Sequence, residues 1–259
     1  MGGVTRNNTA NSVKDIFLAI ETSGYSTGVA LITGDSVLFE TVEDTAARHN
    51  EVLLTLINEA FGHIRLSSAL GSQLSAIDYL AGIFLTIGPG MFTSLRVGLS
   101  VAKGLALARQ IPLKGVNTLL ALSTTGGQVS NSPYPVLALI DARKQELYAG
   151  FYLMGRPCIP PAVISPFFIP EWLSNVKIEY PKPLILVGDG TKLVEPFLRQ
   201  AGIDFITTGV TFPSVKVVAR LGMQLLKDEG PDSLQLLEPL YLRRTDAELK
   251  REKEKGVRD

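Results

Sequence analysis

Runs of apolar residues separated by short polar turns predict strands and helices in a repeating order. Residues 79–87 form a nearly unbroken apolar run of strand length, which indicates a strand covered on both faces, and therefore a central and parallel one. The Gly-Pro-Gly turn at 88–90 ends this run, and a helix is expected over 93–109. Within it, only Arg96, Ser100 and Lys103 make a polar stripe. Such a helix is expected to be covered on two sides.

The pattern before this run predicts a sheet that opens with a hairpin. Residues 16–20 read as a buried strand, and strands over 27–33 and 36–42 follow, joined by a Gly-Asp turn. Glu21 comes at the carboxyl end of the first strand, where an α/β sheet places ligand-facing acids. A carboxylate that only caps the turn is an equally good interpretation.

The helix predicted over 46–61 has more apolar surface than contact with one sheet needs. Leu54 and Phe61 widen its apolar face sideways, which predicts a partner helix. His49 lies in its first turn, and His63 is too distant to complete a metal site of helical spacing. A lone histidine at such a position indicates a surface or capping residue.

The first half ends with a strand expected over 112–116 and a helix over 118–124, followed by a polar linker at 126–133. The second half then repeats the order with which the first begins. Strands over 135–140 and 147–154 then form a second hairpin. Two hairpin-led halves of similar order predict a duplicated α/β fold.

Domain boundaries follow from the predicted linker and the polar ends of the chain. We expect a disordered leader over residues 1–14, an N-terminal α/β domain over 15–125, a smaller C-terminal α/β domain over 134–242 and a charged flexible tail over 243–259. A proline-rich stretch lies at 157–170 and precedes a short helix expected around 171–175.

Two interior glycines, Gly98 and Gly104, distinguish the helix over 93–109. Because an interior glycine costs a helix about 1 kcal/mol relative to alanine, both are predicted to allow close packing against the backbone.

Composition narrows the functional classes. The chain has 46% hydrophobic residues, and 25 basic residues balance 25 acidic ones, so no net charge favours nucleic acid or membrane as a direct ligand. The single cysteine, Cys158, cannot form an internal disulfide, and no apolar run reaches the ~20 residues that span a bilayer. We expect a cytoplasmic protein without a membrane segment.

Several short motifs, in order along the chain, resemble the TsaB (YeaZ) family. They lie at Ala19–Ser23, Ile87–Gly98, Ala102–Ala106, Gly115–Asn117, Ile140–Arg143, Glu146–Tyr148 and Glu238–Arg243. The resemblance implies the duplicated fold of the actin-like ATPase and sugar kinase superfamily (ASKHA, ribonuclease H-like), with a reduced second domain. It also implies a role in forming N6-threonylcarbamoyladenosine at position 37 of tRNA.

Partners are implied by the same resemblance. The family pairs with its paralogue TsaD, the transferase, and with the ATPase TsaE, and reaches tRNA only through the complex. TsaD begins the equivalent helix with Asn-His-x-x-Gly-His, two histidines on one helical face as a catalytic metal needs. Here Thr118 and Leu122 stand at the two histidine positions, and neither can replace imidazole as a ligand. The metallopeptidase interpretation is therefore disfavoured.

Two interpretations remain. The first is a scaffold without catalytic or metal-binding residues, which activates TsaD through the partner-facing residues His49, Leu54, Phe61, Arg96 and Lys103. It leaves open whether ATP or ADP lies at that interface, and it predicts a homodimer when TsaD is absent. The alternative is a nucleotide-dependent kinase-like enzyme that holds phosphates near Glu21, Thr22, Ser23, Gly88 and Gly90.

Overall fold

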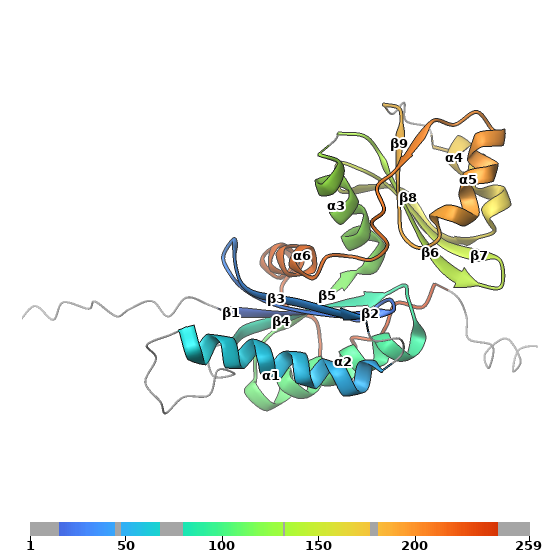
Figure 1. The fold of residues 1–259 in the computed structure, drawn as a ribbon. Coiled ribbons are helices and arrows are strands. Elements are labelled where there is room, and N and C mark those ends of the chain that lie inside the picture. Colours follow the sequence, from blue (N-terminus) through green and yellow to red (C-terminus); the bar gives the residue numbers. More distant parts are fainter. Residues whose placement is uncertain (1–15, 45–47, 68–79, 132, 177–180, 243–259) are drawn as a thin grey trace, which may run out of the picture.

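A computed structural model describes residues 16–44, 48–67, 80–131, 133–176 and 181–242, which form two five-stranded sheets with helices on their faces (Figure 1). The predicted leader and tail lie outside these ranges. Within them, no helix combines the length and the hydropathy needed to cross a membrane.

The first sheet has the strand order β3-β2-β1-β4-β5. Its strands are β1 (Ile16–Glu21), β2 (Ser26–Thr33), β3 (Ser36–Asp44), β4 (Leu80–Gly88) and β5 (Leu113–Asn117). The first three form an antiparallel meander, and β4 and β5 run parallel to β1. Most residues of β1 and β4 are buried, which confirms the predicted central strand.

Helices α1 (His49–Ser67) and α2 (Phe92–Arg109) lie on one face of this sheet, and α6 (Val215–Glu229) covers the other (Figure 1). The helix α1 is longer than predicted and ends at Ser67 instead of residue 61. Gly222 brings α6 so close to the sheet that a Cβ would overlap the Phe84 ring. The contiguous C-terminal domain predicted over 134–242 therefore needs correction, because α6 packs on the first sheet.

The second sheet has the order β10-β9-β6-β7-β8. Its strands are β6 (Val136–Arg143), β7 (Glu146–Leu153), β8 (Arg156–Ile164), β9 (Leu184–Val187) and β10 (Phe205–Thr207). The proline-rich stretch at 157–170 overlaps β8. It pairs only with β7, and an edge strand tolerates proline because its outward amides need no partner.

Helices cover both faces of the second sheet. They are α3 (Thr118–Ser130) on one face, and α4 (Ile169–Ser174) and α5 (Thr191–Gln200) with the short 3-10 turn η2 (Pro166–Phe168) on the other. Alternate residues of β6 enter the two cores, with Leu137 and Leu139 beneath α4 and α5, and Ala138 beneath α3.

The predicted linker at 126–133 is wrong over most of its length, because α3 continues to Ser130. Asn117 caps this helix as predicted, and its side chain accepts a hydrogen bond from the Leu120 amide at 3.1 Å. A Cβ on Gly126 would overlap Val187 Cγ1. The glycine that suggested a linker thus allows the helix to approach the sheet closely.

Candidate functional site

The carboxyl ends of the parallel strands β1, β4 and β5 meet at one edge of the first sheet. Glu21, Gly88 and Asn117 are the last residues of these strands. This edge is where open α/β sheets bind ligands, and here it faces the hairpin between β6 and β7 of the second sheet. The structure therefore places the five residues that the sequence suggested for phosphate binding at one edge of the sheet. They are Glu21, Thr22, Ser23, Gly88 and Gly90.

Glu21 is buried, with 2% of its surface exposed. Its Oε1 accepts hydrogen bonds from the Ser23 amide, at 2.7 Å, and from the Ser23 hydroxyl. Its Oε2 has no hydrogen-bond partner among the described residues. Burial raises the pKa of Glu21 from 4.5 to about 6, although the bonds from Ser23 and Thr86 oppose this shift.

Two amides around the Gly-Pro-Gly turn, those of Gly88 and Met91, are engaged within the chain. The Gly88 amide donates to Thr118 Oγ1 at 3.1 Å, and the Met91 amide donates to the Ser23 carbonyl at 2.8 Å. Gly90 lies so close to Ser23 that a Cβ would overlap the Ser23 carbonyl oxygen. Since a phosphate cradle needs free amide donors, these two amides are not available to the phosphates of the kinase alternative.

The cleft between the two sheets holds a cavity of about 210 Å³. This is smaller than the ~300–1,000 Å³ of typical small-molecule sites. Two carboxylates line it, Asp141 and Asp189, and Asp189 Oδ1 accepts a hydrogen bond from the Asp141 amide at 2.9 Å. The Arg143 guanidinium also lines it, but is paired with Asp141 at 3.0 Å. A triphosphate would face uncompensated negative charge here.

The predicted partner residues lie on α1 and α2, which pack side by side. Leu54 exposes 51% of its surface, whereas Phe61 is half-buried against the first core. Arg96 is exposed and Lys103 is half-buried on α2. His49 is the first residue of α1, and its side chain lies outside the described part of the structure.

A shallow hollow of about 400 Å³ lies over the N-terminal half of α2, beside the start of α1. It is lined by Asn50, Phe92, Thr93, Arg96, Val97, Ser100 and Val101. The Arg96 guanidinium stacks 3.8 Å from the centre of the Phe92 ring, and Arg96 Nε donates to the Tyr241 hydroxyl at 2.9 Å. The segment after α6 therefore holds Arg96 in place at the edge of this hollow.

The two interior glycines of α2 differ. Gly98 packs as predicted, since a Cβ there would overlap Thr22 Oγ1. The prediction for Gly104 is wrong, because a Cβ there would have no neighbour within 4 Å among the described residues. Gly104 lies on the exposed side of α2 with Ser100 and Leu107, and Leu107 exposes 71% of its surface.

The two positions that correspond to the histidine pair are used for packing. Thr118 is fully buried and binds the Gly88 amide, and Leu122 is fully buried between α3 and the second sheet. Over the described ranges, no three histidine, cysteine or acidic side chains come together as a metal site would need.

Asp141, Arg143 and Asp189 were not predicted as cleft residues. Asp141 and Arg143 lie in the motif that supported the family resemblance, but their contact with the first sheet depends on how the halves meet. Arg143 lies 5.6 Å from the centre of the Tyr25 ring in the first half. The sequence did contain a signal for them, because Asp141 lies near the end of β6 and Asp189 follows β9.

Two five-stranded sheets whose strand ends meet across a cleft define the actin-like ATPase and sugar kinase class of fold. The model of the family described as TsaD, tRNA N6-adenosine threonylcarbamoyltransferase, matches residues 42–251. A Haemophilus influenzae relative, "tRNA threonylcarbamoyladenosine biosynthesis protein TsaB", is 34% identical over 239 residues, which cover 87% of this chain and 92% of that protein.

A Bacillus subtilis protein of the same name is 29% identical over 243 residues, covering 90% of this chain and 96% of that protein. The solved structure of YeaZ from Pseudomonas aeruginosa superposes with a TM-score of 0.69 at 23% identity, covering 87% of this chain and all of that one. The chain belongs to the TsaB (YeaZ) family, within the larger TsaD-like family.

Proposed function

We propose that this chain is a non-catalytic subunit in the synthesis of tRNA threonylcarbamoyladenosine, and that it binds and activates the transferase TsaD. Its relatives carry that biosynthetic name, and the transferase is a paralogue in the same larger family. The observation that carries the proposal is the exposed apolar side of α1 and α2, with Leu54, Phe92 and Leu107. Exposed apolar side chains on two helices that pack side by side suit a protein–protein interface.

The chemistry of the cleft supports a non-catalytic role. Thr118 and Leu122 replace the metal-binding pair and are committed to packing. The amides of Ser23, Gly88 and Met91 are engaged within the chain. In this proposal, any ATP or ADP lies at the interface with TsaD, and TsaE and tRNA act through the complex.

Co-elution with TsaD on gel filtration tests the pairing. We expect Leu54→Asp to weaken association at least about tenfold, because a buried unpaired carboxylate is costly, while the melting temperature stays unchanged. Lys103→Glu should weaken it less, since charges at the edge of an interface contribute little.

Leu193→Asp is the matched control. Leu193 lies on α5 of the second sheet and exposes 42% of its surface, so the same change there should leave association intact. Normal co-elution of a folded Leu54→Asp protein would show that α1 is not the docking surface.

A further inference from the structure

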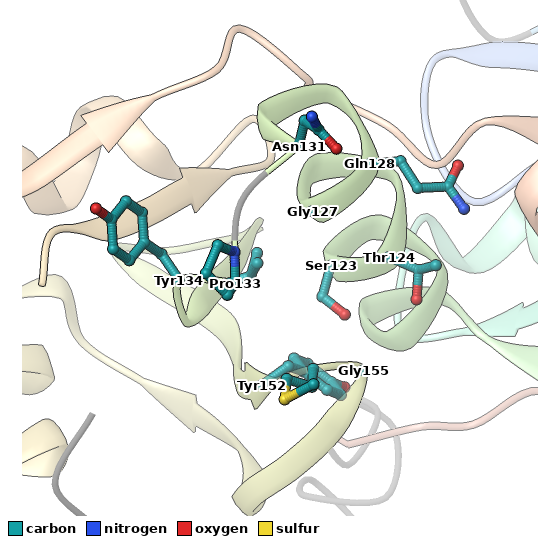
Figure 2. Close-up of a pocket in the computed structure, with 11 residues that line it drawn as sticks. Ser123, Thr124, Gly127, Gln128, Asn131, Pro133, Tyr134, Tyr152 and Gly155 are labelled. Carbon is teal, nitrogen blue, oxygen red and sulfur yellow. The ribbon is translucent and has the colours of Figure 1, made fainter. Parts of the chain in front are cut away.

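A second pocket, of about 530 Å³, lies beside α3 and the second sheet (Figure 2). Its volume is within the range of sites for small organic molecules. Figure 2 shows α3 with Ser123 and Gln128 on one side, Pro133 and Tyr134 on the other, and Tyr152 below them. None of these residues belongs to the cleft or to the exposed side of α1 and α2.

Tyr152 gives the pocket its most informative feature. The residue is 3% exposed and lines the pocket from β7. Its ring lies over Gly150, where a Cβ would come within 2.7 Å of Tyr152 Cε2. Burial raises the pKa of the Tyr152 hydroxyl, so this group stays a neutral donor and acceptor. A hydroxyl on a side chain that lines a pocket can both donate to and accept from the edge of a ligand.

The rest of the lining combines polar and flat apolar groups. The buried Ser123 hydroxyl donates to the Leu120 carbonyl at 2.9 Å and keeps free acceptor capacity. Tyr134 and Pro133 supply flat surfaces, and Gln128 supplies an amide with both a donor and an acceptor.

None of the residues that line the pocket in the described structure is aspartate, glutamate, lysine, arginine or histidine. A charged ligand would therefore lose its hydration without gaining an opposite charge. The lining is suited to an uncharged planar molecule that has hydrogen-bonding edges. Nucleobases have this character, since they bond along their edges and stack on aromatic side chains.

We propose that this pocket binds a nucleobase, and that the Tyr152 hydroxyl bonds to its edge. The base can belong to a free nucleoside or to an unpaired nucleotide of RNA, and the phosphate would point away from the uncharged lining. This site is separate from the pairing proposed above, so the failure of either proposal leaves the other intact.

Calorimetric titration of the full-length chain with adenosine, guanosine, cytidine and uridine tests the site. We expect saturable binding of at least one nucleoside, and no tighter binding of its 5′-monophosphate. Tyr152→Phe keeps the ring and removes only the hydroxyl, so it should weaken binding about two- to tenfold. Tyr241→Phe makes the same change outside this pocket and outside the cleft, and should have no effect.

A second variant fills the pocket. Gly127 lies in α3, and a Cβ there meets nothing nearer than Val136 Cγ2 at 3.9 Å, so Gly127→Leu should fold normally and abolish binding. A short unstructured oligoribonucleotide distinguishes the two sources. Binding of the oligomer that both variants weaken indicates an RNA base, and binding of nucleosides alone indicates a free ligand.

Three results would overturn the proposal. They are no saturable binding of any nucleoside or oligomer at millimolar concentration, wild-type affinity in a folded Gly127→Leu protein, and tighter binding of the monophosphate than of the nucleoside.

Discussion

Gly98 and Gly104 show how differently two residues of one type can be used within one helix. Gly98 faces the sheet, and its missing side chain leaves room for Thr22. Gly104 faces open space on the exposed side of α2. The sequence marks both as unusual for a helix, but the direction in which each points depends on how α2 is rotated against the sheet.

The two alanine variants should therefore change stability in opposite directions. Gly98→Ala would overlap the buried Thr22 and should lower the free energy of unfolding by about 1–3 kcal/mol. Gly104→Ala should raise it by about 0.5–1 kcal/mol, because alanine favours the helix and meets no neighbour. Urea denaturation of both variants measures this, and equal effects would contradict the difference in packing.

Glu21 should make stability depend on pH. Its pKa is about 6 in the folded protein and near 4.5 when exposed, so the folded state binds this proton more tightly. The resulting stability is fully present below pH 4.5 and is lost as the pH rises through 6, an effect of about 2 kcal/mol.

Glu21→Gln removes this titration while keeping an oxygen that accepts from Ser23. The stability of the wild type relative to the variant should therefore fall between about pH 4.5 and about pH 7.5, measured by urea denaturation at each pH. A constant difference across this range would show that Glu21 titrates normally.

At the scale of elements, the sequence predicted the bounds of strands and helices best where an apolar run or a helix cap marks them. The apolar run of β4 and the capped start of α3 were predicted within a residue or two. A prediction failed where glycine has more than one use. Gly126 lies inside α3, so the linker that this glycine suggested was wrong.

The segment after α6 is held to β5 by a buried cation. The Lys114 ammonium, whose side chain is 7% exposed, contacts Asp232 at 2.9 Å and Glu229 at 2.8 Å. Asp232 also accepts the Gly115 amide at 2.7 Å. Two of the bonds that fasten this segment to the sheet therefore depend on Asp232.

Asp232→Ala should lower the free energy of unfolding by about 1–3 kcal/mol, since it leaves buried donors unsatisfied. Glu229→Ala should cost at most about 1 kcal/mol, because the Glu229 side chain is 59% exposed and Asp232 still neutralises Lys114. Chemical denaturation compares the two variants, and an equal loss from both would show that Asp232 is not the main anchor.

At the scale of the molecule, the sequence suggested cleft residues from the first sheet but none from the second half of the chain. Glu21, Ser23 and Gly90 follow from strand ends of the first sheet, which the sequence pattern locates. Asp141 and Asp189 come from the second half, and α3 packs against strands of both sheets. Contacts between halves depend on long-range packing, which periodicity does not encode.

The exposed side of α1 and α2 should also govern self-association. If it is the docking surface for TsaD, a second copy of this chain offers the same helices through a two-fold axis, so a homodimer should form when TsaD is absent. Light scattering over a range of concentrations should show a dimer for the wild type, and a monomer for Leu54→Asp and Leu107→Asp. Adding TsaD should replace the homodimer with a heterodimer, because both use one surface. A homodimer that persists in the two variants, or that binds TsaD without dissociating, would place the two interfaces on different faces.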